Sequence, residues 1–496
     1  MKAIHSSCIL KAQQAVEEAR KKVEHTSYRL GYHIMAPAHW INDPNGLIQW
    51  NGEYHVFYQH HPYSPTGGPI HWGHVKSKDL VHWEHLPIAL APDEEYDKSG
   101  CFSGSAVDDN GTLTLMYTGH ISLNEETDEF IEVQCIATSE DGIHFTKHPQ
   151  NPVITEPPAG GSWHFRDPKV WKHNETWYMV LGNQMDGLGN VLLYESADLV
   201  NWKYSGILVK SNGKLGYMLE CPDFIELNGK HVLLSSPQGI QPEGDHYQNL
   251  YQTGYLVGEF DYETKQFTHG EFEELDKGFD FYAVQSFGDE KGRRIVIGWM
   301  NMWESQMPEQ EHGWAGALTI PRELQLHDDG KLLMKPVEEL KSLREHNISV
   351  QTMIVSENVR LDEIKGDQLE IIAKFSLANT SVEKFGLKVR CSEDGKEHTV
   401  VSYDVKEQKV IVDRSRSGKG EGGIRKGKIE MLHHDVITLQ LFIDRSSLEL
   451  FVNEGELVMT NRIYPDPASL GVELFAEGGT VKLIELEAWT LKDIWA

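Results

Sequence analysis

The sequence predicts an all-β protein, a five-bladed β-propeller followed by a β-sandwich, with a short N-terminal helix in front. Three observations predict this fold: a two-hairpin unit recurs five times, the last third of the chain alternates apolar and polar residues, and helix formers gather near the N-terminus. The expected domains are a helical extension (1–30), the propeller (31–335), a linker helix (336–350) and the sandwich (351–496).

Helix-forming residues mark two places in the chain. Residues 8–24 are mostly Ala, Gln, Glu, Lys and Arg, so we expect one helix there, packed on the main body. Residues 336–347 have the pattern of a short helix and mark the boundary between the two domains. Helical periodicity is absent between these segments.

Each repeat of the first domain begins with an apolar strand, a tight turn and an aromatic-rich strand. The turns in order are Asn51-Gly52, Asn110-Gly111, His173-Asn174, Asn228-Gly229 and Lys291-Gly292. A second hairpin follows, with a signature such as S-K-D-L-V-H-W at 77–83. Four antiparallel strands per repeat favour propeller blades over two stacked solenoid sheets, because radial packing buries both faces of each sheet.

The second domain shows dense period-two alternation without helices. It is clearest in residues 368–375, 386–390, 437–443 and 447–452. This pattern predicts a β-sandwich.

Composition excludes several classes of partner. The formal net charge of -29 argues against nucleic acid or an anionic membrane. The five cysteines are scattered and lack metal-ligand spacing, which is typical of reduced thiols in the cytoplasm, and the N-terminal residues do not form a signal peptide. No phosphate-cradling glycine loop occurs, so we expect neither cofactor nor metal. The oligomeric state stays open, with a homo-oligomer among the options.

Aligning the repeats on their first turns places Asp43, Phe102, Asp167, Glu220 and Tyr282 at the same phase. Successive positions are separated by 59, 65, 53 and 62 residues (102 − 43, 167 − 102, 220 − 167 and 282 − 220). In a propeller this phase is the start of the innermost strand, beside the central axis. Three carboxylates and two aromatic rings are therefore expected to converge at one mouth of the axial channel.

Such a cluster fits glycoside hydrolysis. One carboxylic acid protonates the leaving oxygen while a carboxylate attacks the anomeric carbon, and repulsion among the acids raises the pKa of at least one of them. The alternative is that Asp167 and Glu220 only end strands next to Pro168 and Pro222. Recurrence of the same phase in five repeats argues against that alternative.

Three motifs resemble the signatures of glycoside hydrolase family 32, the β-fructofuranosidases. They are W-I-N-D-P-N-G at 40–46, F-R-D-P at 165–168 and E-C-P-D at 220–223, and D-R-S-S-L-E-L-F at 444–451 is similar to the family's sandwich motif. The N-terminal helix and the lack of a signal peptide further resemble the bacterial intracellular branch of the family, the sucrose-6-phosphate hydrolases.

The resemblance implies a role for each site residue in a retaining reaction that needs no metal or cofactor. Asp43 would be the nucleophile, Glu220 the acid/base, and Asp167 would stabilise the transition state. The implied substrate-binding residues are Trp40, Ile41, Asn42, Gln59, Phe102, Ser103, Arg166, Tyr282 and Trp303.

One departure from the family pattern bears on the substrate. Many relatives carry a tryptophan where this chain has Gly67, so the rim of the pocket lacks an aromatic. The expected substrate is a small sugar, sucrose or sucrose 6-phosphate. An exo-acting hydrolase of fructo-oligosaccharides or fructans is the alternative. A non-catalytic carbohydrate-binding propeller is a third reading, against which the intact Asp43 and Glu220 argue.

Overall fold

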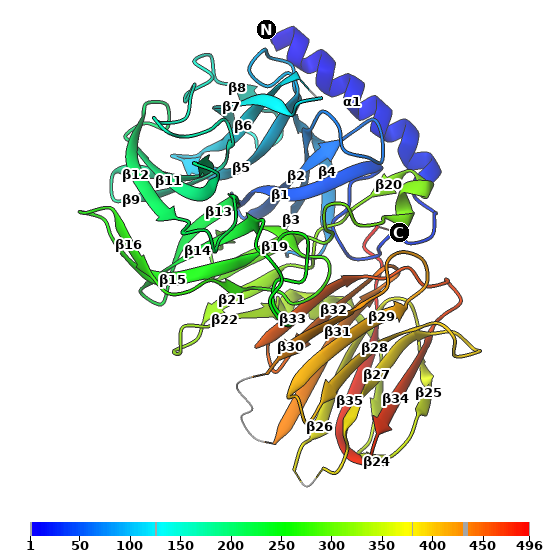
Figure 1. The fold of residues 1–496 in the computed structure, drawn as a ribbon. Helices are drawn as coiled ribbons and strands as arrows, with labels where there is room; N and C mark the ends of the chain where they lie inside the picture. Colours follow the sequence, from blue (N-terminus) through cyan, green and yellow to red (C-terminus); the bar gives the residue numbers. More distant parts are fainter. Residues whose placement is uncertain (1, 125, 379, 430–434, 496) are drawn as a thin grey trace.

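The computed structural model describes residues 2–124, 126–378, 380–429 and 435–495 and consists of a propeller beside a sandwich (Figure 1). Helix α1 (Lys2–Val23) lies along the outside of the propeller and packs against β4 (Trp83–Leu90) through buried residues such as Ala12 and Val16. The helix starts six residues earlier than expected. No helix in the described part of the chain is long and apolar enough to cross a membrane.

The described part of the propeller contains five sheets, one for each sequence repeat, as predicted. Blade 1 contains β1 (His39–Trp50), β2 (Glu53–His61), β3 (His71–Ser77) and β4. Blade 2 contains β5 (Gly100–Asp109), β6 (Thr112–Asn124), β7 (Glu129–Ser139) and β8 (Thr146–Lys147). Blade 3 contains β9 (Phe165–His173), β10 (Thr176–Met185), β11 (Leu188–Ser196) and β12 (Trp202–Lys210).

The last two blades complete the ring. Blade 4 contains β13 (Met218–Leu227), β14 (Lys230–Gln238), β15 (Gly254–Asp261), β16 (Gln266–His269) and β17 (Glu273–Glu274). Blade 5 contains β18 (Tyr282–Gly288), β19 (Arg294–Trp299), β21 (Arg322–Leu326) and β22 (Leu332–Pro336). The long β19–β21 connection carries a 3₁₀ helix (Pro308–His312) and β20 (Trp314–Ala315), which pairs in parallel with β1 and so ties the last blade to the first.

Local turn chemistry explains the repeats. In the first turn of blade 1, Asn51 (φ 51°) and Gly52 (φ 74°) both have positive φ, as a two-residue type I′ hairpin requires, and Trp50 pairs with Glu53 across it. Asn110-Gly111 and Asn228-Gly229 have the same conformation. Asn therefore recurs at this position because it tolerates the left-handed region better than other non-glycine residues.

A register break occurs near the same point of every innermost strand. The breaks lie between Ile41 and Pro44, Phe102 and Gly104, Arg166 and Lys169, Glu220 and Asp223, and Tyr282 and Gln285. A β-bulge turns the local side chains and leaves a residue out of the ladder. Proline, which cannot donate to the ladder, occupies three of these breaks, at positions 44, 168 and 222. The bulges therefore aim the five equivalent positions at the axis.

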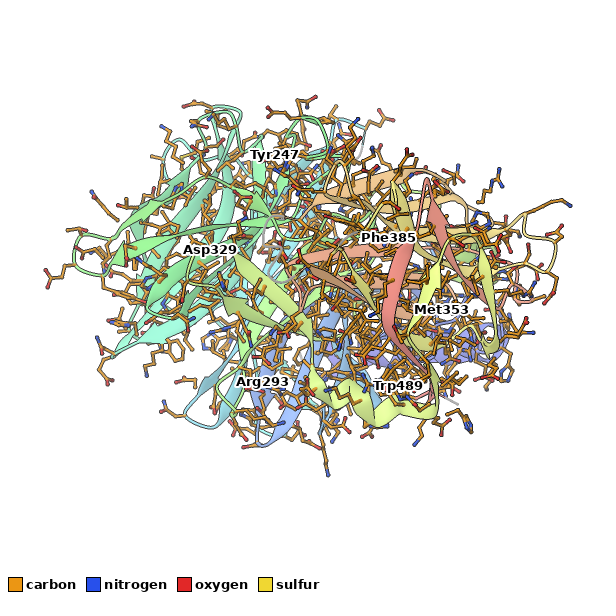
Figure 2. All side chains as sticks on the ribbon, turned by 90° about the horizontal axis from the view of Figure 1, so that it is seen from below. Tyr247, Arg293, Asp329, Met353, Phe385 and Trp489 are labelled. Carbon is orange, nitrogen blue, oxygen red and sulfur yellow. The ribbon has the colours of Figure 1, made fainter. Side chains whose placement is uncertain are left out.

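The second domain is a sandwich of two antiparallel sheets. One contains β23 (Arg344–Val350), β24 (Met353–Val355), β26 (Leu369–Ser376), β31 (Val436–Asp444), β32 (Ser447–Val452), β33 (Leu457–Arg462) and β35 (Val481–Leu491). The other contains β25 (Val359–Lys365), β27 (Lys384–Cys391), β28 (His398–Asp404), β29 (Lys409–Arg416), β30 (Ile424–Lys428) and β34 (Gly471–Glu477). Figure 2 shows the two domains side by side from below, with Phe385 in the sandwich and Asp329 in the propeller.

The expected linker helix over 336–350 needs correction. Only Glu338–Leu343 is helical, as a 3₁₀ helix, and Arg344–Val350 forms β23 along β35. Ile348 and Val350 pack against the sandwich core. β-branched residues at this spacing favour a strand over a helix.

A buried network of charges joins the two domains. His33 contacts Asp444 through Nδ1 (2.8 Å) and Glu449 through Nε2 (2.7 Å), and none of the three side chains is exposed. Glu449 also pairs with Arg322 of blade 5, which reaches Asp276 at 3.2 Å. Phe442 and Phe451 of the sandwich join the propeller core beside this network. The interface is therefore both apolar and charged, which fixes the domains relative to each other.

We expect His33→Gln to remove a pH-dependent part of the stability. Burial lowers the pKa of His33, but the hydrogen bonds to Asp444 and Glu449 raise it overall from 6.5 to about 9. A raised histidine pKa stabilises the fold fully below pH 6.5, and this contribution is lost as the pH rises through 9. The difference in free energy of unfolding between wild type and variant should therefore shrink across that window in urea titrations.

The matched control is His25→Gln, because the His25 side chain is 91% exposed. The free energy of unfolding of this variant should differ little from that of the wild type over the same pH range. At neutral pH, His33→Gln should cost roughly 3–5 kcal/mol, because it leaves buried carboxylates uncompensated. A His33→Gln difference that stays constant between pH 6.5 and 9 would contradict a charged His33.

Candidate active site

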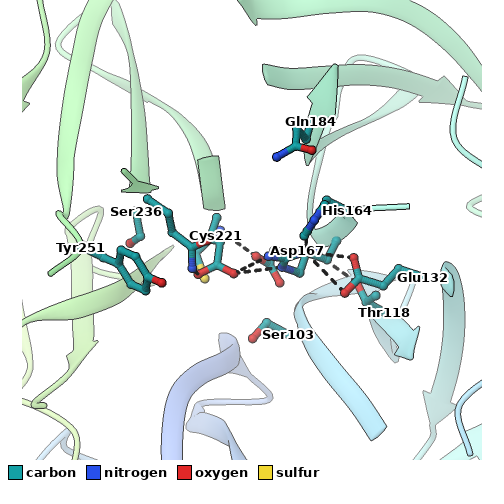
Figure 3. Close-up of polar contacts among 12 residues, drawn as sticks. Ser103, Thr118, Glu132, His164, Asp167, Gln184, Cys221, Ser236 and Tyr251 are labelled. Atoms are coloured by element: carbon teal, nitrogen blue, oxygen red, sulfur yellow. Dashed lines mark hydrogen bonds and ion pairs between the residues drawn. The ribbon is translucent and has the colours of Figure 1, made fainter. Parts of the chain in front are cut away.

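A pocket of about 950 Å³ opens at the mouth of the propeller axis, where the inner strands begin. Its floor contains Asp43, Asp167 and Glu220, so the three acids from blades 1, 3 and 4 converge as the repeat alignment predicts. Figure 3 shows the polar contacts at this site, with Asp167 between Cys221 and Glu132 and with Tyr251 beyond Cys221. Asp43 is 8% exposed and Asp167 is 5% exposed, so both carboxyls are largely removed from water.

A ring of hydrogen bonds fixes Asp43. Asn42 Nδ2 donates to Asp43 Oδ1 (3.0 Å) and to Gln59 Oε1 (2.7 Å). Gln59 Nε2 donates to Ser103 Oγ, and the Ser103 hydroxyl donates to Asp43 Oδ2 at 2.5 Å. Trp40 Nε1 donates to Asn42 Oδ1 at 2.8 Å, which orients the amide. Both carboxylate oxygens therefore accept hydrogen bonds from groups whose own orientation is determined.

The environment shifts the pKa of two of the acids upward. Burial raises the pKa of Asp43 to about 6, helped by the Glu220 carboxylate and opposed by the Ser103 and Asn42 donors. Burial also raises the pKa of Asp167 well above its ordinary value, and the Glu220 and Asp43 carboxylates add to this shift. Burial is the main cause of both shifts and repulsion from the neighbouring carboxylates adds to it, so repulsion alone does not account for the raised pKa values of Asp43 and Asp167.

Asp167 is held by an unusual backbone. Its φ of 67° lies in the left-handed region, which is costly for a residue with a side chain. Its N–H donates to Thr118 Oγ1 (3.1 Å), and Oδ2 accepts the Cys221 N–H at 2.9 Å. This carboxylate therefore links the bulge of blade 3 to the bulge of blade 4 by a hydrogen bond.

Glu220 accepts from four donors. Arg166 donates to Oε1 through Nε (3.0 Å) and Nη2 (2.7 Å), and Gln238 Nε2 and the Tyr282 hydroxyl donate to Oε2 at 3.0 Å and 2.6 Å. Tyr282 has a second acceptor, the Ser236 carbonyl, at 3.2 Å. Tyr282 itself is buried behind Glu220 and does not line the pocket, although it was predicted as a wall.

The other predicted binding residues divide into three groups. Trp40, Asn42, Gln59, Phe102, Arg166 and Trp303 line the pocket. Ser103 lies behind the carboxylate that it orients. Ile41 is fully buried in the propeller core and does not reach the pocket, because alternate residues of a strand point to opposite faces.

Several residues at the site come from strands that the alignment of innermost strands does not examine. Glu132 of β7 pairs with Arg166 at 3.1 Å and contacts His120 of β6 at 3.4 Å. The Arg166 guanidinium and His120 hold the pKa of Glu132 below its ordinary value despite burial. Arg166 therefore spans two carboxylates and fixes the position of Glu220 relative to Glu132. Nothing in the sequence singles out Glu132, because its pairing with Arg166 exists only in the folded protein.

The pocket rim is open at Gly67 and aromatic elsewhere. A Cβ added to Gly67 would meet no atom within 4 Å, so the space directly beside this backbone position is open. Phe102 stacks on His120 with ring centroids 4.1 Å apart, and Phe130 lies beside His120 and also lines the pocket. Tyr217 and Tyr251 complete the opposite rim. These flat faces suit the apolar sides of a sugar.

Comparison with known proteins places the chain. The Glycosyl hydrolases family 32 N-terminal domain matches residues 33–336 and the family's C-terminal domain matches residues 339–490. A sucrose-6-phosphate hydrolase of Zymomonas mobilis is 44% identical over 98% of this chain and 96% of its own length.

Two solved structures have the same fold. The GH32 β-fructofuranosidase of Bombyx mori in complex with sucrose is 39% identical, covers 98% of this chain and 99% of its own, and has a TM-score of 0.88. The fructan 1-exohydrolase IIa of Cichorium intybus is 29% identical over 94% and 98% of the two chains, with a TM-score of 0.82. Because both domain descriptions match in order and the identities extend over nearly the full length, the chain belongs to glycosyl hydrolases family 32.

Proposed function

We propose that this protein hydrolyses the terminal β-D-fructofuranoside of sucrose and sucrose 6-phosphate with net retention. The observation that carries the proposal is the firmly oriented Asp43 carboxylate in the same pocket as Glu220, an acid from another blade. The similarity to a sucrose-6-phosphate hydrolase and to a β-fructofuranosidase that binds sucrose supports this substrate class.

Asp43 is suited to be the nucleophile. Its hydrogen-bonded oxygens are fixed in direction, and near neutrality a carboxyl with a pKa of about 6 is mostly ionised. In the first step an Asp43 oxygen bonds to the anomeric carbon of fructose, while the bond to the leaving oxygen breaks and that oxygen takes a proton from Glu220. In the second step Glu220 accepts a proton from water, the water oxygen bonds to the anomeric carbon, and Asp43 is released.

Glu220 must carry a proton in the first step, and its surroundings allow this. Tyr282 can direct its hydroxyl to the Ser236 carbonyl instead of to Glu220 Oε2, because both acceptors lie within 3.2 Å. Oε2 still accepts from Gln238 but can then carry the proton, while Arg166 continues to donate to Oε1. This exchange gives one residue both protonation states that an acid/base needs.

Asp167 is suited to stabilise positive charge on the ring. It lies in the same pocket as Asp43, and burial strengthens its field because little water is present to screen it. Burial, together with the Glu220 and Asp43 carboxylates, raises the pKa of Asp167, so its negative charge is disfavoured until a positive charge forms beside it.

The rim holds few cations that could meet a phosphate on the leaving sugar. Arg166 is engaged by Glu132 and Glu220, and burial and Arg166 lower the pKa of His164, which keeps that ring neutral. Lys98, whose side chain is 52% exposed and lies 3.5 Å from the exposed Glu95, is the lysine among the described lining residues that can meet a phosphate on the leaving sugar. The alternative, an exo-acting hydrolase of fructo-oligosaccharides or fructans, is favoured by the open rim at Gly67.

We also place the protein in the cytoplasm. All five cysteines are unpaired, and four of them are buried. Unpaired thiols in this number are typical of a reducing compartment.

The direct test of substrate is a comparison of kcat/KM for sucrose, sucrose 6-phosphate and inulin. We expect both disaccharides to exceed inulin by at least about tenfold, since the pocket holds one terminal fructose and a small leaving sugar. In Lys98→Met, kcat/KM for sucrose 6-phosphate should fall by up to about fivefold, because an exposed ion pair contributes up to ~1 kcal/mol. Sucrose itself should be unaffected.

Lys78→Met, an exposed change away from the pocket, is the control and should alter neither substrate. Inulin as the best substrate would favour the exohydrolase alternative. Equal loss for both disaccharides in Lys98→Met would refute the role of Lys98.

The pH dependence of kcat/KM for sucrose should report Asp43. Below its pKa the carboxyl is protonated and cannot attack, so the rate should fall as the pH drops through about 6. Ser103→Ala removes a donor that lowers this pKa, and we therefore expect the acidic limb to move to higher pH. Ser122→Ala, at the rim and away from the carboxylates, should leave the limb in place. A limb that moves to lower pH in Ser103→Ala would be incompatible with this assignment.

A further inference from the structure

A second cavity, of about 790 Å³, lies where the end of α1, the propeller, the sandwich and the C-terminal segment meet. Figure 1 shows α1 ending near β20 and the C-terminus, between the two domains. None of its lining residues lines the active-site pocket. Its size falls within the usual range for sites of small molecules.

Four arginines and three acids line this cavity, and two of the arginines have no acidic partner. Glu24 lies 3.7 Å from Arg20, and both Asp493 (2.8 Å) and Asp367 (3.7 Å) lie against Arg445. The other two arginines, at positions 29 and 390, have no carboxylate within 4 Å among the described residues. This excess of positive charge stands out in a chain of net charge -29.

Both unpaired arginines are held firmly in place. Arg390 is 2% exposed and donates to the carbonyls of Ser469 (2.7 Å) and Arg445 (2.9 Å). It also has a φ of 51°, a left-handed conformation that costs free energy in a non-glycine residue. Arg29 donates to the Ala36 carbonyl (3.0 Å), and its guanidinium lies 5.0 Å from the ring centre of Trp314.

Arg445 connects these groups. Its Nη1 donates to the Arg29 carbonyl at 3.1 Å, and its own carbonyl accepts from Arg390. Burial lowers the pKa of Arg29 to about 10, so its charge is disfavoured by the surroundings yet retained at neutral pH. Glu24 and Asp493 favour the charge of Arg29 from beyond 4 Å, and an anion in the cavity would add a direct counter-charge.

Part of the remaining wall is apolar. Met35, Pro465 and Pro467 line the cavity, and Trp495 lies there with its ring stacked on His85 at 4.6 Å. Planar guanidinium groups match phosphate oxygens well, and an apolar wall suits the organic part of a ligand. We propose that this cavity binds a small phosphate monoester, with Arg29 and Arg390 supplying the counter-charge.

Calorimetric titration of the full chain with inorganic phosphate and with glycerol 3-phosphate tests this site, with saturating fructose present to occupy the active site. We expect one saturable site per chain that fructose does not displace. Arg29→Gln should weaken the affinity by roughly tenfold to a hundredfold, because a charge-assisted contact is lost. Lys203→Gln removes one charge from an 81% exposed side chain of blade 3 and should leave the affinity unchanged.

A second variant keeps the proposal falsifiable if Arg29→Gln does not fold. Asp493→Asn is nearly isosteric and frees Arg445 from its acidic partner, so it should strengthen the binding of both probes. A purely structural cluster of arginines would show no such gain. Absence of saturable binding in the millimolar range, displacement by fructose, or equal affinities in Arg29→Gln, Lys203→Gln and Asp493→Asn would each overturn the proposal.

Discussion

Mutual repulsion among three clustered carboxylates, two of them buried, is the constraint on which the rest of the structure depends. Asp43, Asp167 and Glu220 share one pocket, and burial and neighbouring charge oppose ionisation of the first two. Such a cluster is stable only where the surrounding backbone is rigid enough to resist the repulsion between the acids. The closed ring of blades supplies that framework, because each acid lies at a bulge of an inner strand and β20 ties the last blade to the first.

The contacts of the acids differ, and this difference fits the separate roles proposed for them. Asp43 accepts neutral amide and hydroxyl donors, whereas Glu220 accepts a guanidinium and a tyrosine hydroxyl that has another acceptor nearby. Asp167 accepts a backbone N–H, whose position is set by the fold alone. One chemical group therefore acquires three environments, and environment is what assigns acid and base roles to carboxyls.

The sandwich contributes rigidity rather than site residues. No described sandwich residue lines the active-site pocket. Its charged contacts with His33 and Arg322 hold the segment before β1 and the last blade, which are the two ends of the ring. A ring closed by few strand contacts benefits from a second domain that clamps its ends.

Much of the propeller fold and of the acid cluster could be predicted from the sequence, because the motifs that determine them are local and repeated. Asn-Gly turns fix the hairpins, and the phase of Asp43, Asp167 and Glu220 relative to those turns predicts their convergence. Glu132 could not be predicted in this way, since it lies on β7 and its meaning depends on a contact with Arg166 that only the tertiary structure creates.

Two further predictions were incorrect for physical reasons. Ile41 adjoins the motif acids but faces the core, because side chains alternate along a strand. Residues 344–350 were expected in a helix, yet pairing with β35 overrides their local preference. The cavity beside Arg29 and Arg390 could not be predicted from the sequence either, since its lining comes from segments that are far apart in the sequence.

The central claim is that Asp43 forms a covalent bond to fructose and that Glu220 protonates the leaving group. The most direct measurement is mass spectrometry of Glu220→Ala after reaction with a fructosyl donor whose leaving group needs no protonation. Without Glu220 no group activates water, so we expect a protein heavier by one fructosyl unit, with the addition mapped to the peptide that contains Asp43. Addition at another residue, or none while the activated donor is still consumed, would contradict the account.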